Sequence, residues 1–377
     1  MVNAGKLRIS EYFEEVELTK DYEPYFCSVE DAITIVIIGT FCGLRNLKQI
    51  HGWASHEKIK SILYEKFKVS HVPCYYWLTC LLKILEPKSM SECFTRWVVS
   101  LLPSDMEGYT ISFDGKTVCS TAKMAGYENP LHIVSAQISE LGLTFGQEAV
   151  DGKSNEIPAT QRLIKMLRLK NCVVVADALN CQKDTAEAVI SQGADYLLSV
   201  KDNQPNLKTD IEDYVQDEQL RKTMETVTVR EKSRERIEKR TAFVTNDIDW
   251  LTPKGDWRNL CCIGAINTMF TTKTGNSNEW HYYISSKPLT AKELLKHARA
   301  EWGVESMHWL LDVNFGEDSC RVQNENIQKV LNICRKIVIN SLRVFRDRTD
   351  SKRPFSNIML DCLIDPVFIL DIVNWQN

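Results

Sequence analysis

The sequence lacks a zinc-binding or disulfide pattern, a long apolar run and an excess of positive charge. Its 13 cysteines are scattered without a Cys-x-x-Cys pair, which argues against zinc and a disulfide framework and favours reduced thiols. The longest apolar stretch, residues 32–43, is shorter than the about 20 residues that cross a bilayer, and it predicts a buried helix. No secretory signal is visible between Met1 and Lys20. We therefore expect a cytoplasmic protein without a membrane partner.

The formal charges nearly cancel. The chain carries 46 Lys and Arg against 50 Asp and Glu, a net charge of −4. No protein-wide positive field attracts nucleic acid, so such a partner needs local basic patches. With 377 residues, 44% of them hydrophobic and 25% charged, the composition is that of a globular protein and excludes a disordered or low-complexity chain. A domain size of about 150 residues predicts two or three structural units.

Apolar periodicity divides the chain into a helical first part and an α/β remainder. Up to residue 105, apolar residues recur three and four positions apart, which predicts a helical N-terminal domain over 1–105. Strand-like runs between 109 and 150 precede a helix-strand-helix-strand alternation, the order of a mixed five-stranded sheet flanked by helices. We assign 106–217 to the first part of this α/β core.

The rest of the chain first departs from this alternation and then returns to helices. Residues 218–286 contain strand-like pieces without intervening helices, which predicts a mostly β insertion. Residues 287–377 supply the C-terminal part of the core. There Thr290 and Glu293 predict a capping box that opens a helix reaching Glu305, and a basic helix follows from about residue 326 to 346.

Two aspartates end strand-like runs. Asp114 follows the run from Tyr109, and Asp177 ends the most apolar strand of the chain. For each aspartate taken alone, a turn or helix-capping role is the favoured interpretation. At the carboxyl ends of neighbouring strands, however, two carboxylates converge on the usual ligand crevice, and burying them costs several kcal/mol without a cation. Oxygen ligands suit Mg²⁺ or Mn²⁺ better than zinc. A third carboxylate is offered by Glu301 or Glu305, which lie one helical turn apart.

Several ordered motifs carry a resemblance to a known family. They are Ser112–Thr117, Gly152–Pro158, Val175–Gln182, Ala194–Gln204 and Glu301–Val313. In this order they resemble the bacterial insertion-sequence DDE transposases of the ISAs-one, or H-repeat-associated, family, within the wider IS-four-like superfamily. The resemblance implies a ribonuclease-H-like fold, a catalytic and metal-binding triad of Asp114, Asp177 and Glu305, and Mg²⁺ or Mn²⁺, with two ions. It also implies double-stranded DNA as partner, in the form of terminal inverted repeats and target DNA, and a homodimer on that DNA.

The chain departs from the superfamily around its third carboxylate. Where the superfamily has Tyr and Arg before the glutamate and Lys seven residues after it, this chain has Ala298, Glu301 and Asp312. This departure weakens the transfer of a hairpin mechanism. Glu301 also competes with Glu305 as a ligand, although the motif register favours Glu305.

Candidate DNA contacts are spread over the core. Basic residues gather in residues 221–240 and along the last long helix, where a solvated charged face is the alternative interpretation. A supporting role in the core is equally compatible with Asn203 and Gln204. We read His308 as a packing or site-bordering residue, because a two-metal mechanism needs no histidine. The DNA-binding candidates are Lys116, Lys201, Asn203, Gln204, Trp302, Arg321, Arg335 and Lys336.

The sequence therefore predicts a transposase that cleaves phosphodiester bonds at element ends and transfers the 3′-OH strand to target DNA by a two-metal mechanism. Two alternatives remain open: a metal-dependent nuclease without strand transfer, and a DNA-binding remnant whose catalysis has decayed. The helical N-terminal domain is the candidate for end binding or dimer contacts, although it has no legible helix-turn-helix signature.

Overall fold

The computed structural model describes residues 8–23, 27–103, 105–119, 121, 130–150, 156–233, 236–272 and 275–373. The side chains of Glu301 and Trp302, and the motif residues 152–155, lie outside this description. Among the described residues, no helix combines the length and apolarity that a membrane crossing requires.

The first part of the chain is helical. Its helices are α1 (Arg8–Glu11), α2 (Val29–Phe41), α3 (Leu47–Ala54), α4 (Glu57–Phe67), α5 (Tyr75–Ile84) and α6 (Pro87–Val99). Helix α2 begins where the Ser28 side chain accepts the backbone N–H of Asp31, and it is buried from Asp31 to Phe41. The prediction of a buried helix in this apolar stretch is confirmed.

A mixed sheet forms the middle of the molecule. Its strands are β1 (Thr110–Thr117), β2 (His132–Ile138), β3 (Leu143–Ala149), β4 (Val173–Ala176), β5 (Asp195–Val200), β6 (Glu225–Ser233), β7 (Arg236–Thr245), β8 (Cys262–Thr272) and β9 (Gly275–Ser285). The strand order is β3-β2-β1-β4-β5-β9-β8-β7-β6. Strand β1 pairs antiparallel with β2 and parallel with β4, and β4 pairs parallel with β5.

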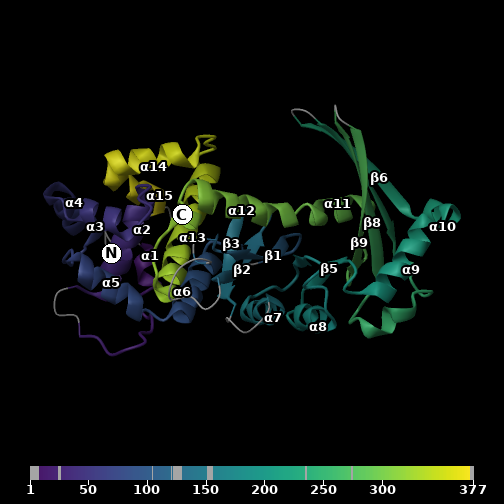
Figure 1. The fold of residues 1–377 in the computed structure, drawn as a ribbon, viewed down its shortest axis with the longest axis horizontal. Helices are drawn as coiled ribbons and strands as arrows, with labels where there is room; N and C mark the ends of the chain where they lie inside the picture. Colours follow the sequence, from purple (N-terminus) through teal and green to yellow (C-terminus); the bar gives the residue numbers. More distant parts are fainter. Residues whose placement is uncertain are drawn as a thin grey trace.

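The sheet is larger than the five strands that the sequence predicts. Residues 225–285 form strands as expected, but β9 pairs antiparallel with β5, so the described strands make one nine-stranded sheet. The β-rich segment therefore continues the sheet (Figure 1). The physical reason is that β5 would otherwise be an edge strand, whose unpaired backbone groups accept another strand.

Helices cover both faces of the sheet. Those after β3 are α7 (Glu156–Met166), α8 (Lys183–Ser191), α9 (Pro205–Gln216), α10 (Glu218–Thr223), α11 (Ala291–Ala298), α12 (Glu301–Val313), α13 (Glu325–Arg348), α14 (Phe355–Ile364) and α15 (Ile369–Val373). Helices α7 and α8 lie on one side of the first strands, whereas α11 and α12 run along the other (Figure 1). Thr290 and Glu293 form the predicted capping box, but the predicted single helix is two, because α11 ends at Ala298 and α12 begins at Glu301.

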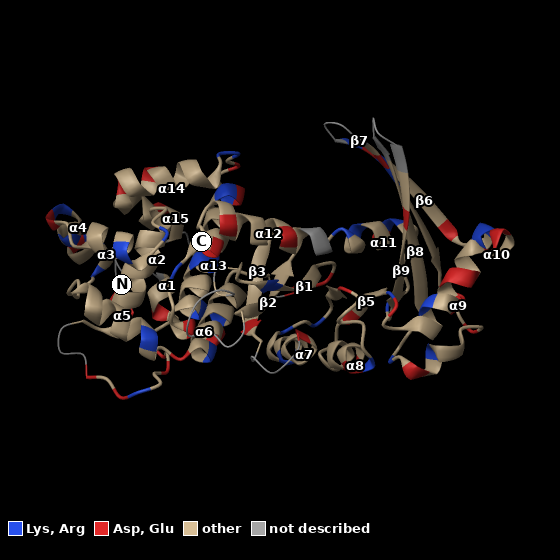
Figure 2. Ribbon diagram, viewed as in Figure 1, with Lys and Arg blue, Asp and Glu red and all other residues tan. Residues whose placement is uncertain are grey.

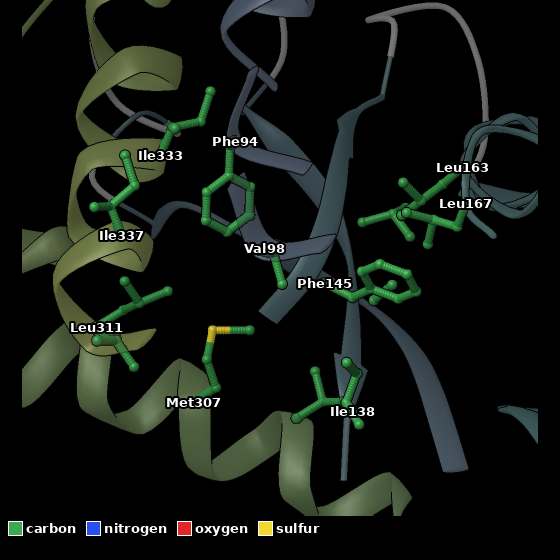
Figure 3. Packing of buried hydrophobic residues seen from close by; sticks show 14 of the residues in the cluster. Phe94, Val98, Ile138, Phe145, Leu163, Leu167, Met307, Leu311, Ile333 and Ile337 are labelled. Carbon is green, nitrogen blue, oxygen red and sulfur yellow. The ribbon is translucent and has the colours of Figure 1, made fainter. Parts of the chain in front are cut away.

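The long helix α13 joins the N-terminal helices to the sheet. It packs against α2, α5 and α6 and against β3. Apolar side chains from several of these elements meet in one buried core. Figure 3 shows part of it, with Phe94, Val98, Ile138, Phe145, Met307, Leu311, Ile333 and Ile337. This packing fixes α12 against β1 and β2, where the candidate site lies.

Candidate active site

Asp114 and Asp177 lie side by side on neighbouring parallel strands. In the register of β1 and β4, Phe113 is opposite Ala176, so the next residues are Asp114, within β1, and Asp177, directly after β4. The prediction that Asp114 ends its strand is wrong, because β1 continues to Thr117 through its pairing with β2. The pKa of Asp114 is raised to about 6, first by burial and then by the negative charges of Glu156 and Asp177. The sequence prediction that these two carboxylates converge agrees with this geometry.

Helix α12 brings a third carboxylate toward the aspartates. Glu305 is exposed on the helix, which packs against β1 and β2. Its negative charge is also among those that raise the pKa of Asp114. Because the side chain of Glu301 lies outside the described part of the chain, the choice between the two glutamates rests on the motif register.

The turn after β4 fixes the carboxylate of Asp177. Its Oδ1 accepts the backbone N–H of Asn180 at 3.1 Å and the Asn180 side-chain Nδ2 at 3.0 Å. The same Nδ2 donates to Oε1 of Glu156 at 2.9 Å, and Asn180 is fully buried. A buried amide with two carboxylate partners holds both carboxylates in one arrangement.

Glu156 is a site residue to which sequence reasoning assigned no role. It is the first residue of α7, and its Oε2 lies 2.9 Å from Nε2 of His132 on β2. Burial alone would raise the Glu156 pKa, but hydrogen bonds from His132 and Asn180 lower it below its ordinary value. In the sequence, Glu156 was marked only by its place inside the motif Gly152–Pro158. That motif does not reveal that Glu156 lies near Asp177.

His308 borders the aspartates from α12. Its Nδ1 lies 3.5 Å from Oδ2 of Asp114. Burial first, and then the positive charges of Lys336 and Lys116, lower the His308 pKa to about 3, so the imidazole is neutral. Its buried Nε2 has no hydrogen-bond partner among the described residues. The interpretation of His308 as a site-bordering residue agrees with this position.

Lys116 belongs to an internal ion-pair network. Its Nζ lies 2.5 Å from Asp312, 3.1 Å from Glu317 and 3.7 Å from Asp318. Burial alone would lower the Lys116 pKa, but the negative charges of Glu317 and Asp312 raise it. Asp312 is the position where the superfamily has a lysine, and here its charge is neutralised by a lysine from β1. The network fastens α12 to the sheet.

Three of the basic residues proposed as DNA contacts lie inside or beside this network. Arg335 and Lys336 are only 3% and 1% exposed, and the Lys116 side chain is 13% exposed. Arg335 pairs with Glu317, and Lys336 donates to the Ser135 hydroxyl at 2.7 Å. The expectation that Arg335 and Lys336 contact DNA from the last long helix is therefore wrong, because both side chains are buried in ion pairs or hydrogen bonds. They stabilise buried acceptors, since a buried charge requires such partners.

The remaining DNA-contact candidates divide into two groups. Lys201 and Arg321 are exposed. The side chain of Asn203 donates to the carbonyl of Ala178 at 2.6 Å, and that of Gln204 donates to the carbonyl of Cys181 at 2.9 Å. These two amides hold the turn that follows Asp177. Asn203 and Gln204 therefore have the supporting role that was the alternative to DNA contact. Basic and acidic residues lie beside one another on α4, α9 and α10 (Figure 2).

The two aspartates fit a hard divalent cation. Asp177 Oδ1 is held by Asn180, whereas Oδ2 receives no hydrogen bond from any residue that the structure describes. The mutual repulsion that raises the Asp114 pKa would be relieved by a cation. Mg²⁺ commonly uses one or two protein carboxylates and takes its other ligands from water and phosphate. Within the described ranges, no three His, Cys, Asp or Glu side chains are grouped closely enough to hold a metal ion, so Glu305 does not complete a ligand set with the two aspartates in this structure.

The chain is similar to known transposases. Residues 118–341 match the family described as transposase DDE domain. "H repeat-associated putative transposase YhhI" of Escherichia coli (strain K12) is 28% identical over 348 residues, covering 89% of this chain and 91% of that protein. "Putative protein YbfL" of the same strain is 32% identical over 278 residues, covering 72% of this chain and 73% of that protein. A cryo-EM structure of the piggyBac transposase synaptic complex with hairpin DNA has 9% identity and a TM-score of 0.42, covering 98% of this chain and 76% of that one.

The matched range contains two of the three acidic residues of the candidate site. Asp177 and Glu305 lie inside residues 118–341, and Asp114 lies just before them. The match spans more than half of the chain, and H repeat-associated transposases are similar to it over most of their length. The chain therefore belongs to the family of proteins with a transposase DDE domain, and it is similar to bacterial H repeat-associated transposases.

Proposed function

We propose that the protein cleaves phosphodiester bonds at the ends of a DNA insertion element and joins the freed 3′-OH strand to target DNA. The observation that carries this proposal is the position of Asp114, within β1, beside Asp177, directly after the neighbouring strand β4, with Glu305 on the helix packed against β1. Membership of a transposase family supports the same substrate class. We also propose a ribonuclease-H-like core, which the order β3-β2-β1-β4-β5 supports.

Asp114, Asp177 and Glu305 are the residues that would hold Mg²⁺ or Mn²⁺, as a pair of ions. When bound, such ions lower the pKa of an attacking water and stabilise the oxygens around phosphorus. Asn180 orients the Asp177 carboxylate, and the neutral His308 leaves the charge of Asp114 available to a cation. Hydrolysis breaks one phosphodiester bond and leaves a 3′-OH. Attack by that hydroxyl then forms one new phosphodiester bond in the target as another breaks.

DNA binding is proposed to use local contacts. Lys201 and Arg321 are the exposed basic candidates near the core, and the helices of residues 1–105 are candidates for binding the element end or a second copy. A homodimer on DNA would bring two element ends together. Because the net charge is −4, we expect modest nonspecific affinity that falls as salt rises.

The test uses a labelled duplex with the terminal sequence of the element that flanks the coding region, incubated with Mg²⁺ or Mn²⁺. The expected result is cleavage at the element boundary that Asp177→Ala abolishes and that Asp249→Ala, an exposed aspartate after β7, retains. Unlabelled plasmid supplies the target, and a joined product is expected. Cleavage without joining would favour a metal-dependent nuclease. Binding without cleavage would favour a remnant without catalysis.

A further inference from the structure

A continuous hydrogen-bonded chain connects Asp177 to a carboxylate outside the proposed triad. Asp177 is bonded to Asn180, and Asn180 is bonded to Glu156. Glu156 in turn lies 2.9 Å from Nε2 of His132, whose Nδ1 lies 2.9 Å from the Thr117 hydroxyl. The chain therefore runs from β4 through the start of α7 to β2 and β1, so four elements determine the position of one carboxylate.

The sequence makes room for this chain at Gly115. A Cβ at Gly115 would lie 2.3 Å from Oε2 of Glu156 and 2.3 Å from Nε2 of His132. Both atoms belong to the hydrogen-bonded pair Glu156–His132, which lies against β1 at the residue after Asp114. Glycine is thus required here for space. Thr117 is opposite His132 in the register of β1 and β2, so its hydroxyl can fix the imidazole ring.

Both oxygens of Glu156 are already engaged. Oε1 accepts from Asn180 and Oε2 contacts His132, and the Glu156 side chain is only 13% exposed. Asp177 is different, because Oδ1 takes both Asn180 donors and the described residues give Oδ2 no donor. The hydrogen bonds therefore engage one oxygen of Asp177 and leave the other for a ligand. Both oxygens of Glu156, in contrast, are engaged by Asn180 and His132.

We infer that Glu156 is a positioning residue, which holds Asn180 so that Asp177 presents Oδ2 to a divalent cation. The inference rests on the proposed metal-dependent function and deepens it. Residues that orient metal ligands through hydrogen bonds commonly contribute about 10–100-fold in metal affinity. Glu156 acts on Asn180 as a hydrogen-bond acceptor through Oε1, and glutamine keeps such an acceptor oxygen while removing the charge. This separates a positioning residue from a fourth ligand.

Binding of Mn²⁺ to the full chain without DNA tests this role. Electron paramagnetic resonance of free Mn²⁺ gives the dissociation constant for the unaltered chain, Glu156→Ala and Glu156→Gln. We expect Glu156→Ala to weaken Mn²⁺ binding about 10-fold or more. Glu156→Gln should bind Mn²⁺ more tightly than Glu156→Ala, because both variants lose the negative charge but only glutamine keeps an oxygen that accepts from Asn180. Glu148→Ala is the matched control, since it removes a different ion pair of α7, the one with Arg162.

Three results would overturn the inference. Unchanged Mn²⁺ binding by Glu156→Ala would mean that Glu156 does not position the site, and an equal loss in Glu156→Gln would mean that its charge is needed. Absence of Mn²⁺ binding by the unaltered chain would also contradict it. Circular dichroism establishes that each variant is folded. Asn180→Ser tests the same hydrogen-bonded path. Combined with Glu156→Ala, it should cause no further loss of Mn²⁺ affinity, because the effects of residues that act through one path are not additive.

The same measurements separate this inference from the proposed function. An unaltered chain whose Mn²⁺ affinity depends on Glu156, but which does not cut element DNA, would refute the transposase activity and leave the positioning role standing. Cleavage that depends on Asp177, together with full Mn²⁺ binding in Glu156→Ala, would refute the positioning role alone.

Discussion

Replacing Asp114 with asparagine should stabilise the fold at neutral pH. Its neighbours and its burial raise the Asp114 pKa from 3.8 to about 6, and each pKa unit corresponds to about 1.4 kcal/mol, so roughly 3 kcal/mol is the upper bound. Because the Asp114 side chain is 38% exposed, solvent screening reduces this to about 1–2 kcal/mol. Asparagine has nearly the shape of the protonated acid and carries no charge, so Asp114→Asn should recover that free energy.

The sign of the pH dependence follows from the raised pKa. Above about pH 6 the folded state holds Asp114 ionised at a cost that the unfolded chain does not bear. As the pH falls from about 6 to 3.8, this cost disappears, and below 3.8 both states are protonated. The advantage of Asp114→Asn should therefore be largest at about pH 8 and vanish at about pH 3.5, as urea denaturation would measure. A variant less stable than the unaltered chain at about pH 8 would refute this reasoning.

Three further changes give separate expectations. Gly115→Ala should displace the side chain of Glu156 and cost about 1–3 kcal/mol in urea denaturation, and an unchanged midpoint would contradict the close approach. Lys116→Met should lower the free energy of unfolding by about 3 kcal/mol, because the fully buried Glu317 loses one of its cations, and a neutral result would refute the network's role. Lys201→Ala should weaken DNA binding across all sequences and reduce the salt slope by about 1, measured by fluorescence anisotropy at several salt concentrations. An unchanged slope would remove Lys201 from the DNA surface.

The paired aspartates were accessible to sequence reasoning. Each follows a run of strand-forming residues, and parallel strands bring their carboxyl ends to one edge of a sheet. The contact between Glu156 and Asn180 was not accessible, because it joins the turn after β4 to the start of α7 through the packing of both on the sheet. Local patterns identify strands and helices, but they do not identify which distant side chains meet.

The same limit explains why two sequence predictions, the exposure of Arg335 and Lys336 and the size of the sheet, were wrong. The periodicity of α13 predicts a helix and its polar residues, but Arg335 and Lys336 turn inward because buried Glu317 and Ser135 accept their hydrogen bonds. The β-rich segment was recognisable as strands, yet nothing in its residues showed that β9 would pair with β5. Pairing partners depend on the whole sheet and are therefore settled by tertiary structure.

The assignment of Asp114, Asp177 and Glu305 is tested most directly by cleavage of the element-end duplex in Mn²⁺. The variants to compare are Asp114→Asn, Asp177→Asn, Glu305→Gln and Glu301→Gln. We predict that the first three reduce cleavage to background and that Glu301→Gln still cleaves. Continued cleavage by any of the first three, or loss of cleavage in Glu301→Gln while Glu305→Gln remains active, would contradict the assignment.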